Sequence, residues 1–178
     1  PKEHRFIDLS DYGRPVAIAI AKSLKNTDFT PIHVTIAFVI SGLIGIGFML
    51  GDFVWAAALF YILKSILDAA DGELARVKQT PSYTGRYLDS ISDIILNFLI
   101  LSGLWYLTDA NILITILAFI GLQLQGTLYN YYYVILRNNF GGDKTSRIIE
   151  NETPIAMAGE KQRDVDILFR LYRILYGK

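Results

Sequence analysis

The segment at residues 32–51 constrains the fold more than any other feature of the sequence. It is apolar almost throughout and contains no Lys, Arg, Asp or Glu. A helix of about 20 residues is long enough to cross the hydrocarbon core of a bilayer. A buried helix of a soluble bundle would show a polar stripe at helical spacing, and this segment shows none. We therefore expect an integral membrane protein of the all-α class.

Three more apolar segments follow the first one along the chain. They cover residues 53–67, 87–107 and 112–136, and the first of these three is interrupted only by Lys64. Hydrophobic residues make up 52% of the 178 residues, charged residues make up only 19%, and the mean hydropathy is +0.35. A soluble domain of this size does not need so much apolar surface. The sequence therefore predicts a helical bundle with four transmembrane helices.

Lysine and arginine residues are distributed unequally between the two sides of these predicted spans. The links at residues 51–52 and 108–111 contain neither residue type. The opposite side carries Lys22, Lys25, Arg76, Lys78, Arg86, Arg137, Lys144 and Arg147. Because basic residues stay on the cytoplasmic side, we expect that side, and both chain ends, to be cytoplasmic. Lys64 alone lies at membrane depth, one turn before Asp68, and we expect it to pair with nearby acids.

The segments on either side of the transmembrane domain are more polar. In residues 1–29, Pro15 opens a stretch at residues 16–25 that suits a juxtamembrane amphipathic helix, lying on the membrane surface or packed on the ends of the spans. Residues 30–138 form the transmembrane domain. Residues 139–178 form a cytoplasmic segment that ends in an amphipathic helix at residues 164–176, too short to span a bilayer. A formal net charge of zero gives no field that favours nucleic acid.

Four aspartates define the candidate site. Asp68 and Asp71 are three residues apart, and Asp89 and Asp93 are four apart, so each pair shares a helix face. The link between the pairs contains a proline and a glycine, which fits a tight turn between antiparallel helices. Four carboxylates together are unstable unless a cation cancels their charge. The absence of cysteine excludes thiolate ligands, so oxygen-bound divalent metal is the expected cation.

The residues around these acids favour a phosphate-containing ligand. Small residues leave room for a bulky ligand near the backbone, namely Ala69, Ala70, Gly72, Ala75, Gly85 and Ser90. Arg76 adds a rigid fork of donors that suits phosphate oxygens. Metal, phosphate and a position at the membrane together indicate phosphoryl transfer on a lipid.

At this point the sequence resembles a known family. The pattern D-x-x-D-G-x-x-A-R-x8-G-x-x-x-D-x-x-x-D is the signature of the CDP-alcohol phosphotransferases, also called CDP-alcohol phosphatidyltransferases. Every fixed position is present, namely Asp68, Asp71, Gly72, Ala75, Arg76, Gly85, Asp89 and Asp93. The resemblance covers roughly residues 30–137. Members usually have six transmembrane helices, so the four visible here indicate either a fragment or a shortened relative.

The resemblance implies a reaction and its residues. Members transfer a substituted phosphate from a CDP-linked alcohol to an acceptor hydroxyl and release CMP, in phospholipid synthesis. Asp68, Asp71, Asp89 and Asp93 would hold Mg²⁺ or Mn²⁺, with two ions expected, and Asp93 would be the catalytic base. The residues expected to bind the CDP-alcohol are Gly72, Ala75, Arg76, Ser82, Gly85, Ile32 and His33. His33 has an alternative role as an ordinary interfacial residue.

The substrates stay open at this level. CDP-diacylglycerol or an ether-lipid equivalent is the favoured donor, with a polar or phosphorylated alcohol as acceptor. Arg137 and Arg86 are the candidate acceptor contacts, although the cytoplasmic excess of basic residues also explains them. The alternative is a CDP-choline or CDP-ethanolamine enzyme that acts on diacylglycerol. A cation or proton transporter and an inactive scaffold are hypotheses of other classes.

The family resemblance also bears on assembly and location. It implies a homodimer in a cell membrane or an ER-type membrane. The active site would lie at the cytoplasmic face, in contact with membrane lipids, and no nucleic acid is expected as a partner.

Overall fold

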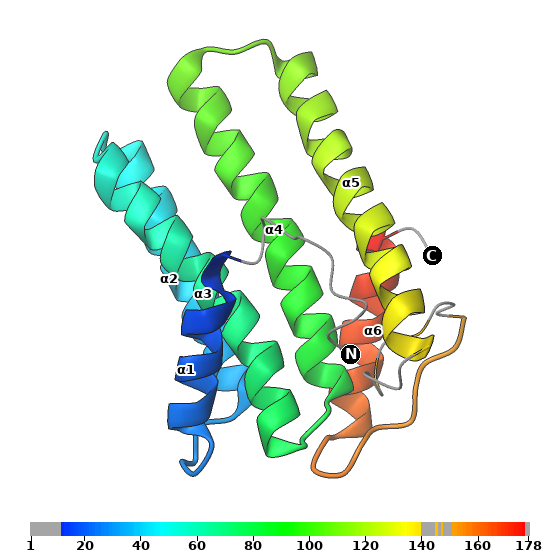
Figure 1. Cartoon of the computed structure of the whole chain (residues 1–178). Coiled ribbons are helices and arrows are strands. Elements are labelled where there is room, and N and C mark those ends of the chain that lie inside the picture. Colours follow the sequence, from blue (N-terminus) through cyan, green and yellow to red (C-terminus); the bar gives the residue numbers. More distant parts are fainter. Residues whose placement is uncertain (1–11, 140–144, 146, 148–150, 177–178) are drawn as a thin grey trace.

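The protein is described by a computed structural model that covers residues 12–139, 145, 147 and 151–176, without the side chains of Arg137 and Asn138. All regular elements in these ranges are helical, which confirms the expected all-α class (Figure 1). The α-helices are α1 (Arg14–Leu24), α2 (Pro31–Leu50), α3 (Val54–Lys78), α4 (Tyr83–Thr108), α5 (Ile112–Asn139) and α6 (Gln162–Tyr176).

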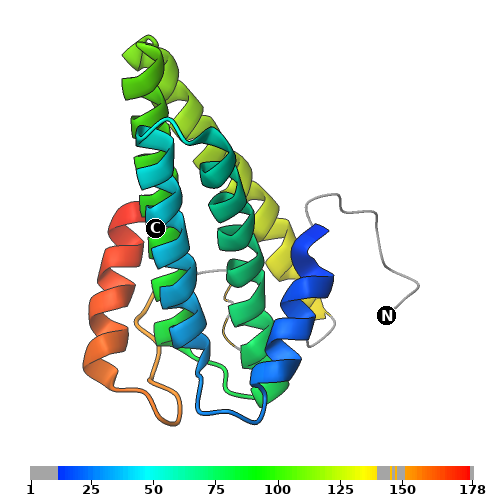
Figure 2. The ribbon, with the colours of Figure 1, turned by 90° about the vertical axis from the view of Figure 1, so that its left-hand side faces the viewer.

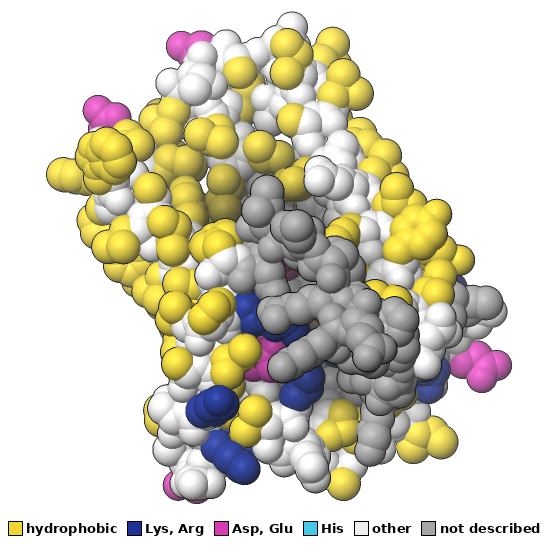
Figure 3. All heavy atoms as spheres, in the orientation of Figure 1, with side chains coloured by type: hydrophobic (Ala, Val, Ile, Leu, Met, Phe, Trp, Pro, Cys, Tyr) yellow, Lys and Arg dark blue, Asp and Glu magenta, His cyan; other side chains and the backbone are white. Residues whose placement is uncertain are grey.

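Three helices of the described chain are long and apolar enough to cross a membrane. They are α2, α4 and the Ile112–Leu136 part of α5. The remaining predicted span, at residues 53–67, corresponds to α3, which has 25 residues but contains Lys64, Asp68 and Asp71 in its middle. Composition therefore does not identify α3 as a span, and a fourth crossing stays a prediction. Hydrophobic side chains cover the upper part of the molecule in Figure 3, and Lys and Arg gather lower down.

The helices α2 and α3 pack closely against each other. The Ser41 hydroxyl on α2 donates a hydrogen bond to the Phe60 carbonyl on α3 (2.9 Å). Gly45 faces Tyr61, and a Cβ at Gly45 would lie 2.7 Å from Tyr61 Cε1. The turn between the helices passes through Asp52, whose φ of 64° lies in the left-handed region that Asp tolerates better than most residues. The small residues of α2 therefore determine how near α3 can lie.

Gly45→Leu is expected to destabilise the protein by about 1–3 kcal/mol, because the added side chain must push Tyr61 and α3 away from α2. Gly47→Leu is the matched control, since nothing lies within 4 Å of a Cβ at Gly47. The melting temperatures of both variants and of wild type are measured in the same detergent, and Gly45→Leu should melt at a lower temperature than Gly47→Leu. Equal losses in both variants would contradict the predicted contact.

The helix α1 packs along the lower part of α3 (Figures 1 and 2). Ala17 and Ala21 are fully buried and pack with Ala70 and Leu74 of α3. The helix predicted at residues 16–25 is thus present at Arg14–Leu24, and one of its faces lies on the bundle. Its contact with a membrane surface stays a prediction.

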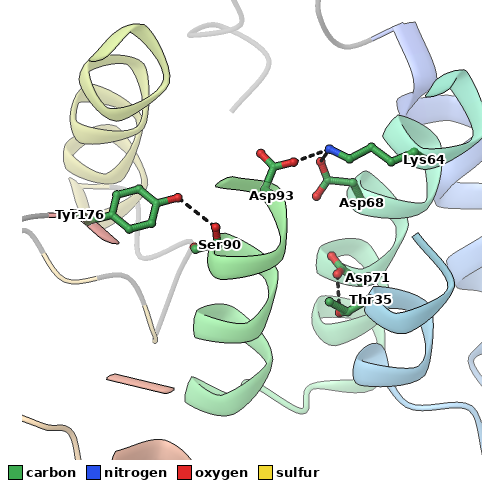
Figure 4. Close-up of polar contacts among 7 residues, drawn as sticks. All are labelled: Thr35, Lys64, Asp68, Asp71, Ser90, Asp93 and Tyr176. Carbon is green, nitrogen blue, oxygen red and sulfur yellow. Dashed lines mark hydrogen bonds and ion pairs between the residues drawn. The ribbon is translucent and has the colours of Figure 1, made fainter. Parts of the chain in front are cut away.

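The helix α6 packs on the first half of α4. Val165, Phe169 and Tyr172 are buried against Tyr83 and Tyr87. At the end of α6, the Tyr176 hydroxyl donates to the carbonyl of Ser90 (3.1 Å; Figure 4). The amphipathic helix predicted at residues 164–176 is therefore present, and its aromatic face covers α4 near the aspartates.

Candidate active site

Three of the four predicted metal-binding aspartates converge. Asp68 and Asp71 on α3 and Asp89 on α4 each place a carboxylate oxygen within 4.8 Å of the others. The geometry follows from a short link, residues 79–82, between the two helices. Gln79 ends α3 in the left-handed conformation (φ 55°), and Ser82 caps the start of α4. We call Asp68, Asp71 and Asp89 the aspartate triad.

Asp71 is the triad member that a residue of α2 holds in place. It is only 7% exposed, and its Oδ2 accepts a hydrogen bond of 2.6 Å from the hydroxyl of Thr35 (Figure 4). Thr35 lies on α2 and is itself buried. Sequence reasoning missed Thr35; the available signal was a hydroxyl about one turn into a largely apolar span.

Asp89 has a buried oxygen, Oδ1, that no hydrogen-bond donor in the described part of the chain reaches. A buried carboxylate oxygen without a partner is costly, and the two neighbouring carboxylates add repulsion. A hard divalent cation would satisfy this oxygen and draw on the other two acids. The donor set of the triad therefore fits Mg²⁺ or Mn²⁺.

Asp93 is not one of the three acids whose oxygens lie within 4.8 Å of one another, and it forms an ion pair with Lys64 of α3 next to Asp68 (Figure 4). Lys64 Nζ is also 4.0 Å from Asp68 Oδ2 and 5.3 Å from the ring centroid of Phe38. The side chain of Lys64 is 12% exposed, whereas that of Asp93 is 39% exposed. The predicted pairing of Lys64 with the acids is confirmed, and its ammonium lies between Asp93 and the triad member Asp68.

Arg76 lies over Gly72 on the same helix. A Cβ at Gly72 would lie 3.6 Å from Arg76 Nη2. Arg76 Nε donates to Glu73 Oε2 (3.4 Å), and Arg76 Nη2 forms an ion pair with Glu73 Oε1 (2.9 Å). Arg14 Nε of α1 donates to the same Glu73 Oε1 (3.2 Å). Glu73 thus joins α1 to α3 and fixes the guanidinium predicted to bind the diphosphate. Sequence reasoning did not single out Glu73, although its spacing of three residues from Arg76 was a signal.

Several residues predicted to bind the CDP-alcohol make local contacts at helix ends. The hydroxyl of Ser82 accepts from the Gly85 amide (2.8 Å). Gly85 also adjoins Ile32, since a Cβ there would lie 3.9 Å from Ile32 Cγ1. His33 forms a capping box with Thr30 at the start of α2, and the Ala75 carbonyl accepts from the Thr80 amide (3.0 Å) at the end of α3. Their contact with a nucleotide stays a prediction.

The Glu160 carboxylate caps the start of α4. Its Oε1 accepts from the Ser82 hydroxyl (2.7 Å) and the Thr84 amide (2.6 Å), and its Oε2 accepts from the Met157 amide (2.9 Å). Burial opposes ionisation of Glu160, but these hydrogen bonds outweigh it and hold the pKa of that carboxyl below its ordinary value of 4.5. The segment before α6 is thereby anchored at the helix that carries Asp89.

Glu160→Gln is expected to lower stability at pH 7 by about 0.5–1 kcal/mol, because a neutral amide loses the attraction to the helix N-terminus. The folded-state pKa is depressed, so the contribution of Glu160 is present above its unfolded pKa and is lost as pH falls through the lower folded value. Wild type and variant should therefore melt alike in acid. Thermal melts from pH 3 to 7 check this, with exposed Glu152→Gln as control; an equal effect of both variants would contradict it.

The two predicted acceptor contacts are only partly described. Arg86 donates to the Thr145 carbonyl (2.7 Å), and its guanidinium lies 5.2 Å from the Tyr87 ring centroid and 5.9 Å from that of Tyr172. It therefore helps to hold the segment before α6 against α4. The side chain of Arg137 lies outside the described residues. The acceptor role of both arginines stays a prediction.

Comparison with known proteins agrees with the motif. Residues 29–156 match the family described as CDP-alcohol phosphatidyltransferase, a stretch that covers most of the chain and all eight motif positions. A search of curated proteins found no match. The chain therefore belongs to the CDP-alcohol phosphatidyltransferase family, a family of transferases in phospholipid synthesis.

Proposed function

We propose that this protein is a metal-dependent membrane enzyme that transfers a substituted phosphate from a CDP-linked lipid to the hydroxyl of a polar alcohol and releases CMP. The family carries out phosphatidyl transfer from CDP-alcohols, and the three apolar helices agree with an integral membrane protein. The observation that carries the metal dependence is the aspartate triad: its oxygens lie within 4.8 Å of one another, and a buried oxygen of Asp89 has no hydrogen-bond donor among the described residues.

The chain's own residues divide the work of this reaction. Bound at the triad, Mg²⁺ or Mn²⁺ would neutralise the diphosphate and stabilise the departing CMP. Thr35 holds the Asp71 carboxylate in place, and Arg76 donates to diphosphate oxygens. Asp93 takes the proton from the acceptor hydroxyl. The acceptor oxygen then forms a bond to the phosphorus that carries the lipid alcohol, and the bond from that phosphorus to CMP breaks.

A lipid donor suits the position of the triad. Exposed apolar side chains, including Ile62 and Leu63, precede Asp68 on α3 by one to two turns. Acyl or ether chains could lie along this surface while the diphosphate reaches the acids. This suits CDP-diacylglycerol or an ether-lipid equivalent as donor, and the parallel assay with CDP-choline and diacylglycerol separates it from the branch in which the acceptor is the lipid.

We place the site at the cytoplasmic face, with α3 as a membrane-spanning helix in addition to α2, α4 and α5. Support comes from the basic residues at the end of α3 and the start of α4, and from the basic-free links at the opposite end. Pairing of Lys64 with Asp93 lowers the cost of charge within such a span. We also propose that the protein forms a homodimer, and the support for this is the family resemblance.

CMP release is the measurement that tests the proposal. Protein in liposomes should release CMP from CDP-diacylglycerol with one of a panel of polar and phosphorylated alcohols, and EDTA should reduce the rate to background because the triad then lacks its ion. CDP-choline with diacylglycerol is the parallel assay for the alternative branch. Full-rate CMP formation without divalent metal would contradict the proposal. Metal-dependent ion flux without CMP would favour a transporter.

A further inference from the structure

The ammonium of Lys64 lies between two aspartates that were expected to share metal. It pairs with Asp93 of α4 and lies 4.0 Å from Asp68 Oδ2 of α3 (Figure 4). Asp68 is also a member of the triad, so Lys64 is next to the metal-binding group without belonging to it. A positive charge bound to the protein therefore already bridges Asp68 and Asp93.

Lys64 is also enclosed. Its side chain is 12% exposed, and its Nζ lies 5.3 Å from the ring centroid of Phe38 on α2, a distance at which a cation is attracted to the ring. A buried ammonium that loses its carboxylate is strongly disfavoured. For a second divalent ion to bind between Asp68 and Asp93, Lys64 would have to leave both carboxylates and find no equivalent partner.

The triad does not need Asp93 to form a metal site. Asp68, Asp71 and Asp89 bring their oxygens together by themselves, and Asp89 Oδ1 has no donor in the part of the chain that is described. The four acids thus form one group of three that fits a divalent ion and one acid that is paired with a lysine.

We propose that Lys64 takes the place of a second divalent ion, so that this enzyme binds one metal ion at the triad and uses the lysine as a permanent cation beside Asp93. The proposal rests on the proposed function, because it takes the triad as the metal site. Lys64 acts as a positioning residue: it holds the Asp93 carboxylate between α3 and α4 and outside the metal coordination.

Binding of Mn²⁺ to the protein in detergent, followed by electron paramagnetic resonance and calorimetry, tests the stoichiometry without any substrate. Wild type should bind one Mn²⁺ per chain, with any second ion at least about 100-fold weaker. Lys64→Met keeps the apolar stem, removes the charge and should bind two ions. Lys64→Met with Asp93→Asn should return to one ion.

Lys25→Met is the matched control, since it removes an exposed lysine beyond the end of α1; it should bind one ion. Two tight ions in wild type, or a single ion in a folded Lys64→Met variant, would overturn the proposal. If Lys64→Met does not fold, the wild-type stoichiometry still decides. One bound ion without CMP release from any donor would contradict the proposed function and still support the role of Lys64.

Discussion

Asp93→Asn is expected to lower the rate of CMP release by about 100- to 10,000-fold, the range over which a positioned general base contributes. The amide cannot take the proton of the acceptor hydroxyl. Binding of Mn²⁺ should stay close to wild type, because Asp93 lies outside the aspartate triad and pairs with Lys64 instead. The expected result is thus an enzyme that binds metal and donor but does not turn over.

Two measurements on the same preparation check this prediction: CMP release at saturating donor, and Mn²⁺ affinity by electron paramagnetic resonance. Asp52→Asn makes the same chemical change in the turn between α2 and α3, where Asn tolerates the positive φ of 64°. It should keep both activity and metal affinity. Loss of Mn²⁺ binding both in Asp93→Asn and in the double variant Lys64→Met with Asp93→Asn would mean that Asp93 is a metal ligand rather than a base, because the double variant has no lysine that could pair with Asp68 instead.

Asp89→Asn is expected to weaken Mn²⁺ binding by more than about 100-fold and to reduce CMP release to background at ordinary metal concentrations. Asn offers one neutral oxygen in place of a carboxylate, and the other atom becomes an amide nitrogen that cannot bind the ion. The metal-free variant should melt at the wild-type temperature or above it, because repulsion among the three acids is relieved.

The combination of lost activity and retained stability separates a metal ligand from a residue needed only for folding. Mn²⁺ titration, CMP release and metal-free melting curves provide the three readouts. Addition of Mn²⁺ should raise the melting temperature of wild type but not of Asp89→Asn, since only a bound ion stabilises the folded state. Unchanged Mn²⁺ affinity in Asp89→Asn would exclude the triad as the metal site.

Much of the fold follows from local patterns in the sequence. The apolar segments predicted α2, α4 and α5, and the amphipathic stretches predicted α1 and α6, because hydrophobic periodicity depends only on neighbouring residues. The second apolar segment, with Lys64 inside it, is helical as expected, but the charged residues of that helix prevent its assignment as a span from composition. The helix contacts of α6 were left open because an amphipathic face does not specify its partner.

The sequence was enough to predict which aspartates form the candidate site, but not which three of them converge and which one pairs with a lysine. Spacings of three and four residues placed the aspartates on two helix faces, and the eight fixed motif positions identified the family. The same spacings could not show that Asp93 pairs with Lys64 and is not part of the aspartate triad. That depends on how α3 and α4 are placed relative to each other, which no local pattern encodes.

What the sequence by itself determined is the all-α membrane class, the four acids and the family, because these depend on composition and on short-range spacing. Only the tertiary structure decided which side chains meet across long separations. Thr35 reaches Asp71 from 36 residues away, and Glu160 reaches the start of α4 from 76 residues away. Lys64 likewise pairs with Asp93 across 29 residues. Such contacts depend on helix packing, in which a shift of one residue changes every partner, and that packing separates the aspartate triad from the acid proposed to act as base.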